Sequence, residues 1–115
     1  MNENGKPLVS IVTPSFNQAA FLEETICSVL DQDYDNLEYI IVDGGSTDGS
    51  LEIIQKYADR LAWWVSEPDQ GQTEAINKGF AKSRGEIFAW INSDDTYLES
   101  AISEAAAYLV AHPEV

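Results

Sequence analysis

Glu86-Ile-Phe-Ala-Trp-Ile-Asn-Ser-Asp-Asp-Thr-Tyr97 is the stretch of sequence that decides the fold. Its first half, Ile87–Ile91, is a short run of bulky apolar and aromatic residues. Such a run is typical of a β-strand that is buried on both faces of a sheet. The run ends at Asn92, and two adjacent carboxylates, Asp94 and Asp95, follow it. The sequence therefore predicts a buried strand that delivers acidic side chains to one end of a sheet.

The pair Asp94 and Asp95 needs a physical reason, because neighbouring negative charges repel each other and are costly to bury. A divalent cation would offset the repulsion, since Mg²⁺ and Mn²⁺ are commonly held by one or two carboxylates while phosphate groups supply other ligands. An acidic turn or a helix N-cap is the alternative, because aspartate is favoured there. The pair by itself leaves both interpretations open.

Length and composition indicate one globular domain. The chain has 115 residues, 44% of them hydrophobic, including three Trp, four Phe and five Tyr, so it can form a core and is not disordered. Its net charge of −14 and its six Lys and Arg residues argue against a nucleic-acid partner, because phosphate contacts need basic side chains. A basic strip that would hold anionic lipid is missing for the same reason.

No apolar stretch is as long as a membrane-spanning helix, and the polar start of the chain does not resemble a signal peptide. Cys27 is the only cysteine, which excludes an internal disulfide and fits a reducing compartment. It lies in a helical pattern and is expected to be a small core residue rather than a nucleophile. We therefore expect a cytoplasmic protein without a membrane segment.

Strands and helices are expected to alternate along the chain. Apolar, β-branched runs predict further strands at Leu8–Thr13, which Pro14 ends, at Glu38–Asp43 and at Leu61–Val65. Apolar residues at helical spacing predict helices between Asn17 and Asp31, from Leu51 to Ala58, over Gln72–Lys82 and from about Leu98 onward. The last of these is expected to place Ile102, Ala105 and Leu109 on one inward side. This alternation predicts a Rossmann-like α/β fold, with a mostly parallel sheet and helices on both faces.

Polar or aromatic residues follow every predicted strand. They are Pro14-Ser-Phe-Asn17, Asp43, Glu67 with Asp69, and Asn92-Ser-Asp-Asp95. In a parallel sheet the carboxyl ends of the strands meet at one edge, where ligands bind. Phe16 offers a face for a flat ring, and Asp43 offers an acceptor for a ring N–H. With a metal at the two aspartates, these residues predict a nucleoside diphosphate held through a divalent ion.

The chain resembles the family 2 glycosyltransferases of GT-A fold over nearly its whole length. Five motifs carry the resemblance in order: Val12-Thr-Pro-Ser-Phe-Asn17, Ile41-Val-Asp-Gly-Gly-Ser-Thr-Asp-Gly-Ser50, Ser66-Glu-Pro-Asp-Gln-Gly71, Ala75-Ile-Asn-Lys-Gly-Phe80 and Asn92-Ser-Asp-Asp95. The resemblance implies an enzyme that uses a nucleotide-diphospho-sugar, often a UDP-sugar, and inverts the anomeric centre. Its acceptor would be a saccharide or a lipid-linked molecule, as in cell-surface polysaccharide biosynthesis.

The resemblance also implies roles for particular residues. Pro14, Ser15 and Phe16 would line the uracil and the ribose, and Asp43 would accept a hydrogen bond from the base. Asp94 and Asp95 match the acidic "DxD" motif, which carries a Mn²⁺ or Mg²⁺ ion and contacts the ribose or the diphosphate of the donor. Asp94 is the best candidate for direct coordination.

Two positions depart from the family pattern. The family often has Asp-Asp-Gly-Ser after its second strand, whereas this chain has Asp43-Gly44-Gly-Ser, which leaves Asp43 alone to contact the base. Many members also begin the metal motif with Asp, where this chain has the neutral Asn92. The departure puts a role for Asn92 in doubt.

Inverting transfer needs a base that deprotonates the acceptor hydroxyl. In the family this base lies well beyond the metal motif, so it is expected after Val115. The nearby acids Glu99 and Glu104 are better explained as solvated helix residues. We therefore expect residues 1–115 to be one donor-binding domain of a longer enzyme, lacking the acceptor-binding half, inactive alone, and acting at the inner face of the membrane in the full-length protein.

Two further expectations concern partners and alternatives. The sheet edge beside Ile87, Phe88 and Trp90 is expected to be open, which would favour a homo-oligomer. A non-catalytic module that binds a nucleotide or a cation remains the alternative to a transferase, and an acidic α/β interaction domain is a third interpretation.

Overall fold

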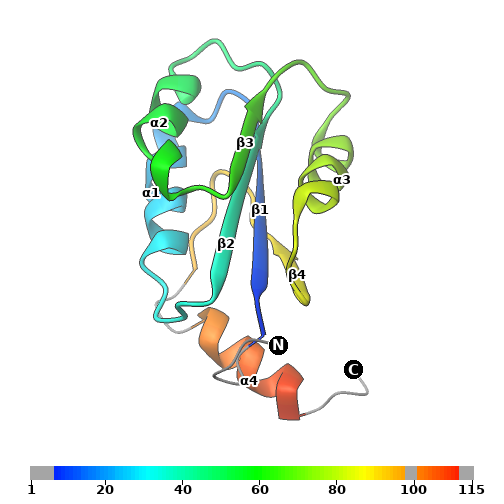
Figure 1. Cartoon of the computed structure of the whole chain (residues 1–115). Helices are drawn as coiled ribbons and strands as arrows, with labels where there is room; N and C mark the ends of the chain where they lie inside the picture. Colours follow the sequence, from blue (N-terminus) through cyan, green and yellow to red (C-terminus); the bar gives the residue numbers. More distant parts are fainter. Residues whose placement is uncertain (1–6, 98–100, 112–115) are drawn as a thin grey trace.

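The computed structural model describes residues 7–97 and 101–111, and strands alternate with helices through these ranges as predicted (Figure 1). The predicted helix start near Leu98 and the residue Glu99 lie outside them. The elements are β1 (Val9–Ser15), α1 (Ala19–Leu30), β2 (Leu37–Asp43), α2 (Ser50–Lys56), the 3₁₀ helix η1 (Ala58–Arg60), β3 (Trp63–Ser66), α3 (Gln72–Lys82), β4 (Ile87–Trp90) and α4 (Ala101–Ala111).

The described strands form one parallel sheet in the order β3-β2-β1-β4. Ile11 in β1 lies opposite Tyr39 in β2 and Ala89 in β4. The chain proceeds outward from β1 to β2 and β3, and then crosses back to place β4 on the other side of β1. The predicted parallel α/β sheet is therefore confirmed, and the direction of winding reverses between β1 and β4.

Helices cover both faces of the sheet, with α1 and α2 on one side and α3 on the other (Figure 1). Because successive strand residues point to opposite faces, Ile11 and Ile41 pack in the cluster under α1 and α2, whereas Val12 and Val42 pack in the cluster under α3. A Cβ at Gly79 would lie 2.5 Å from Cγ1 of Val12. Helix α3 can approach the sheet this closely only because residue 79 has no side chain.

Helix α4 lies at the end of the sheet opposite the strand carboxyl ends (Figure 1). The Ile102 backbone N–H donates to Gln32 Oε1 at 2.9 Å, which ties the start of α4 to the end of α1. Ile102 and Ala106 are buried in the same cluster as α1, while Ala105, expected to face inward, is exposed. Helix α4 therefore extends the core through Ile102, as expected, and through Ala106 in place of Ala105.

Strand β4 is covered on one face only, which corrects the prediction of a strand buried on both faces. Ile87 and Ala89 pack against the main cluster, but Phe88 is 54% exposed and Trp90 is 46% exposed. Helix α3 contacts β1 and β2 mainly. Its residue Phe80 packs against this face of β4, with its ring centroid 5.6 Å from that of Phe88. The composition of the apolar run predicts burial on both faces, because it carries no information on how far α3 extends across the sheet.

The sequence predicted that Pro14 ends the first strand, and this is wrong. Strand β1 continues to Ser15, which pairs with Asp43 of β2. The Val12 carbonyl accepts from the Ile91 N–H at 3.0 Å, so the backbone of Pro14, two residues further on, faces the same side. The strand β4 has already ended there at Trp90. A proline costs no hydrogen bond where no partner strand is present.

Within the described ranges, no helix is long and apolar enough to cross a membrane.

Candidate functional site

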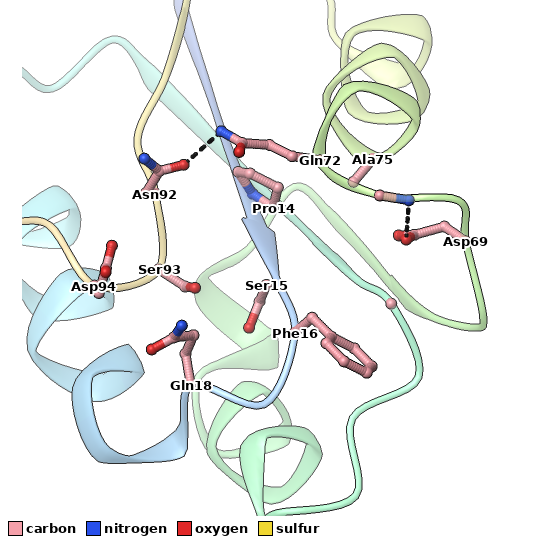
Figure 2. A pocket seen from close by; sticks show the side chains of 12 residues that line it. Pro14, Ser15, Phe16, Gln18, Asp69, Gln72, Ala75, Asn92, Ser93 and Asp94 are labelled. Atoms are coloured by element: carbon pink, nitrogen blue, oxygen red, sulfur yellow. Dashed lines mark hydrogen bonds between the residues drawn. The ribbon is translucent and has the colours of Figure 1, made fainter.

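A pocket of about 470 Å³ opens at the carboxyl ends of β1 and β4 (Figure 2). This is within the range of volumes that bind small ligands. Its lining comes from the end of β1, the start of α1, the loops after β2 and β3, the start of α3 and the turn after β4. The lining residues are Pro14, Ser15, Phe16, Gln18, Gly44, Asp69, Gly71, Gln72, Ala75, Asn92, Ser93 and Asp94.

The predicted site residues divide into two groups. Pro14, Ser15, Phe16 and Asp94 line the pocket together, although Asp94 is distant from the others in sequence. Asp43 and Asp95 do not line it. The sequence gave no role to three uncharged lining residues, Gln18, Gln72 and Ser93. Gln18 and Gln72 stand at the starts of helices, whereas Ser93 lies within the strand-end run Asn92-Ser-Asp-Asp95, where its neighbours Asp94 and Asp95 carry the stronger signal.

The loop after β1 exposes Phe16 to the pocket. Asn17 has a φ of 51°, in the left-handed region that Asn tolerates better than most residues. Its N–H donates to Ser46 Oγ at 2.8 Å, and its Oδ1 accepts from the Thr47 N–H at 2.9 Å. These contacts fix the turn to the loop after β2 and leave the Phe16 side chain 58% exposed at the pocket rim (Figure 2).

Ser15 places a polar group at the floor of the pocket. Its side chain is 5% exposed, and its Oγ has no hydrogen-bond partner among residues 7–97 and 101–111. Ser93 is equally buried on the facing turn, and Figure 2 shows Gln18 beside the two hydroxyls. Because an unpaired buried hydroxyl costs free energy, Ser15 is suited to a ligand or a water molecule that completes its hydrogen bonding.

Asp43 is fully buried, and its carboxylate is directed into the loop that follows β2. Oδ2 accepts from the N–H groups of Gly45 at 3.1 Å and Ser46 at 2.8 Å and from Ser66 Oγ at 2.8 Å, and Oδ1 accepts from Ser46 Oγ at 2.6 Å. The sequence placed this residue opposite a base. In the structure these hydrogen bonds connect the Asp43 carboxylate to the Gly-rich loop and to Ser66 at the end of β3.

The turn after β4 presents Asp94 to the pocket. The Asp95 N–H donates to the Asn92 carbonyl at 3.1 Å, which closes a four-residue turn. Thr25 Oγ1 of α1 donates to the Asp95 carbonyl at 2.5 Å, and Gln72 Nε2 of α3 donates to Asn92 Oδ1 at 2.6 Å. The turn is therefore anchored from both faces of the sheet.

The carboxylates of Asp94 and Asp95 are exposed, and neither makes a hydrogen bond or an ion pair within the described part of the chain. The residues that follow them, Thr96 and Tyr97, are not helical, so neither aspartate stands directly before a helix. The acidic turn is confirmed, and the helix N-cap is not.

The donor set fits a cation that takes most of its ligands from elsewhere. In the part of the chain that the structure describes, no group of three or more His, Cys, Asp or Glu side chains is placed to hold a metal ion. Asp94 brings a carboxylate without a hydrogen-bond partner in the described ranges to the pocket, beside Asn92. Mg²⁺ and Mn²⁺ are suited to such a site, because they bind through one or two carboxylates while phosphate oxygens and water supply the other ligands.

Asp69 is the second carboxylate of the pocket. Its Oδ1 accepts from the Gly71 N–H at 3.0 Å, just before α3 begins. The sequence placed Asp69 at the ligand edge of the sheet without giving it a role. Figure 2 shows it on the side of the pocket away from Asp94.

The sequence profile described as "Glycosyl transferase family 2" matches residues 10–115. The chain belongs to this family. Its fold is the GT-A fold of glycosyltransferases: S. aureus TarS (residues 1–349) in complex with UDP-GlcNAc superposes with a TM-score of 0.82 at 26% identity, over 91% of this chain and 32% of that one. The mannosyltransferase PcManGT from Pyrobaculum calidifontis, in complex with GDP-Man and Mn²⁺, gives 0.79 at 29% identity, over 93% of this chain and 33% of that one.

Relatives within glycosyl transferase family 2 carry glycosyltransferase names. A Bacillus subtilis protein named for teichuronic acid biosynthesis, the glycosyltransferase TuaG, is 36% identical over 110 residues, which cover 93% of this chain and 44% of that protein. An uncharacterized glycosyltransferase of Haemophilus influenzae is 39% identical over 92 residues, covering 77% of this chain and 37% of that protein. The chain therefore spans less than half of the length of these relatives.

Proposed function

We propose that residues 1–115 form the donor-binding part of an inverting glycosyltransferase that takes a sugar from a nucleotide-diphospho-sugar, with a UDP-sugar as the first candidate. The position of the pocket carries this proposal. It lies between the ends of β1 and β4, where the direction of winding reverses, and ligands of open α/β sheets bind at that reversal. Membership of the family and the donor complexes of the two structural relatives support it.

Each wall of the pocket has a proposed role. The exposed ring of Phe16 stacks on the base, and Pro14 and Ser15 contact the ribose, with the unpaired Ser15 hydroxyl available for a hydrogen bond. Asp94 holds a Mn²⁺ or Mg²⁺ ion, and Asp95 supports it. Such an ion supplies the positive charge that stabilises a departing diphosphate. In a protein of net charge −14, that charge is also needed to overcome the repulsion between the carboxylates and the donor.

The catalytic base is proposed to come from the part of the full-length protein outside residues 1–115. The pocket carboxylates of the described residues are Asp69 and Asp94, which we assign to donor binding. The acceptor is proposed to be a saccharide or a lipid-linked molecule of cell-surface polysaccharide biosynthesis, as the name of TuaG suggests. We place the full-length protein in the cytoplasm, at the inner face of the membrane.

The proposed donor site is tested by thermal unfolding with UDP and Mn²⁺. At a UDP concentration near 100 times its Kd, binding would stabilise the domain by about 2.7 kcal/mol, which is several degrees in Tm for a domain of this size. We expect this shift with Mn²⁺ or Mg²⁺ and its loss in excess chelator. An equal shift in chelator would refute the metal bridge. No shift with UDP or GDP under any of these conditions would refute the nucleotide site.

Catalysis is tested separately. Residues 1–115 are expected to bind UDP without transferring sugar, whereas the full-length protein is expected to release UDP from a UDP-sugar in the presence of its acceptor. Turnover by residues 1–115 alone would place the base within them. Donor binding without turnover in the full-length protein, across donors and acceptors, would favour the non-catalytic binding module.

A further inference from the structure

We propose that Asp69 is the residue that accepts the hydrogen bond from the ring N–H of the donor base, and that it selects bases whose ring nitrogen carries a proton. This inference rests on the proposed function, because it identifies the residue of the same pocket that binds the base of the donor. It replaces the assignment of that role to Asp43, which the sequence suggested.

The Asp43 carboxylate has no free acceptor with which to bind a base. Its carboxylate is 0% exposed and accepts four hydrogen bonds from Gly45, Ser46 and Ser66. A ligand could reach it only if the loop after β2 gave up some of these bonds. The loss of hydrogen bonds to a buried charged group is costly, so Asp43 acts as a structural support.

Asp69 has the free acceptor that Asp43 lacks. It lies on the pocket wall, and its only hydrogen bond within the described ranges goes from the Gly71 N–H to Oδ1, so Oδ2 remains available. Figure 2 shows Asp69 and Phe16 toward one side of the pocket and Asp94 toward the other. A base stacked on Phe16 would therefore lie at the Asp69 end, with its diphosphate toward Asp94.

Asp69, which belongs to the loop after β3, can reach the pocket wall because residue 44 at the end of β2 is glycine. A Cβ at residue 44 would lie 3.1 Å from Oδ1 and 3.2 Å from Oδ2 of Asp69. The Asp69 carboxylate thus fills the space in front of Gly44 that a side chain at residue 44 would take. Glycine at residue 44 therefore lets a carboxylate from the loop after β3 stand at the end of β2.

The chemistry of a carboxylate predicts which bases are accepted. An ionised aspartate can only accept hydrogen bonds. Uracil and guanine each carry a proton on the ring nitrogen between their carbonyl or amino substituents, whereas cytosine and adenine present a lone pair at the equivalent ring atom. A lone pair facing Asp69 would be repelled, so the site is expected to bind UDP and GDP in preference to CDP and ADP.

The test compares nucleotide selectivity in Asp69→Asn with that in wild-type protein, by calorimetric titration with UDP, GDP, CDP and ADP in Mn²⁺. Asparagine keeps the shape and the acceptor for the Gly71 N–H, and it turns an amide donor toward the ring. We expect the preference for UDP over CDP to fall by at least about tenfold, since hydrogen bonds to charged groups are worth roughly tenfold to a hundredfold in affinity. Glu67→Gln is the matched control, because it removes the same charge from the same loop outside the pocket.

A second pair of variants tests the position rather than the residue. Asp69→Ala should lose the selectivity, and adding Gly44→Asp to Asp69→Ala should restore part of it by returning a carboxylate to the same space. Unchanged selectivity in Asp69→Asn, or wild-type protein that binds UDP and CDP equally, would overturn this inference while leaving the donor site intact. Wild-type protein that binds none of the four nucleotides would overturn the proposed function itself.

Discussion

Phe16 and Phe21 are both more than half exposed, at 58% and 52%, but only Phe16 lines the pocket. An aromatic ring that stays exposed in the folded protein contributes little to the free energy of unfolding. Substitutions of Phe16 and Phe21 should therefore affect stability alike, while only those of Phe16 should affect ligand binding. The same contrast applies to Asp94 and Asp95, which are adjacent and exposed while only Asp94 lines the pocket. Paired substitutions can therefore isolate the function of single side chains.

Phe16→Ala is expected to weaken UDP binding by about fivefold or more, because stacking of a base on an aromatic ring is worth about 1–3 kcal/mol. The Tm of the unliganded protein should stay close to that of wild type. Titration of UDP in Mn²⁺ measures the first effect, with Phe21→Ala as the control that keeps wild-type affinity. Equal losses in both variants would mean that the effect is not due to stacking in the pocket.

Asp94→Ala is expected to abolish the cation-dependent Tm shift with UDP while leaving unliganded stability within about 0.5 kcal/mol of wild type, as for other exposed sites. Removing one of two neighbouring carboxylates relieves repulsion, whereas loss of a helix cap would cost about 1 kcal/mol. Asp95→Ala should reduce the shift less. A larger loss in Asp95→Ala than in Asp94→Ala would reverse the assignment of the metal ligand.

The residues that sequence reasoning placed well are those whose role follows from their position at a strand end. Phe16 and Asp94 both line the pocket, because the carboxyl ends of parallel strands lie at the same edge of the sheet. Asp43 also lies at a strand end, but its side chain turns into the neighbouring loop, and the direction of a side chain cannot be read from strand position. Asp69 and Gly44 come together only through the fold, so their pairing leaves no local pattern.

At the scale of elements, helix α1 receives its N-terminal support from another loop. Gln18 makes no side-chain capping hydrogen bond, and the Ala19 N–H donates instead to Asp48 Oδ2 at 3.0 Å. Asp48 Oδ1 also accepts from the Ser50 N–H and hydroxyl at 3.1 and 2.7 Å, at the start of α2. One carboxylate therefore joins the beginnings of two helices, through a contact between loops that leaves no local pattern in the sequence.

The hydrogen bond from the Ala19 N–H, followed by that from the Ser50 hydroxyl, lowers the pKa of Asp48 below its ordinary value. A lowered pKa in the folded state means that Asp48 stabilises the fold above its unfolded-state pKa, and that this contribution is lost as the pH falls through the folded-state pKa. Asp48→Asn should therefore lower Tm at pH 7, and the difference from wild type should shrink as the pH is lowered into the acid range. Asp59→Asn, at an exposed carboxylate in η1, is the control. A difference between Asp48→Asn and wild type that stays constant down to acid pH would show that the charge of Asp48 is not involved.

The elements themselves were predictable to different degrees. Helix α3 has the predicted bounds, Gln72–Lys82, because Gly71 precedes a clear apolar stripe and the turn at Ser83 follows it. Strand β1 runs past Pro14, since the cost of proline depends on whether a neighbouring strand is present, and that is a property of the sheet. The exposed face of β4 was not predicted for a similar reason, because its burial depends on how far α3 extends across the sheet. Local sequence specifies an element, and its neighbours decide its end and its burial.

At the scale of the molecule, β4 leaves an open edge. Among the described residues it pairs with β1 alone. Phe80, Phe88 and Trp90, here called the aromatic patch, lie beside this edge on the α3 face, with Phe88 and Trp90 about half exposed. We propose that in the full-length protein the part outside residues 1–115 covers the aromatic patch. In residues 1–115 alone, an uncovered edge with exposed aromatic rings is a surface for pairing with a second copy.

Residues 1–115 are therefore expected to self-associate as their concentration rises, measured by sedimentation velocity over a wide range of concentrations. The net charge of −14 opposes this association, so added salt should strengthen it by screening the repulsion between copies. Trp90→Lys should shift the equilibrium toward monomer, because it places a charge in the aromatic patch. Phe21→Lys makes the same change on α1, on the other face of the sheet, and should leave association unchanged. A monomer at every concentration and salt level, or equal effects of the two lysine variants, would contradict an interface at β4.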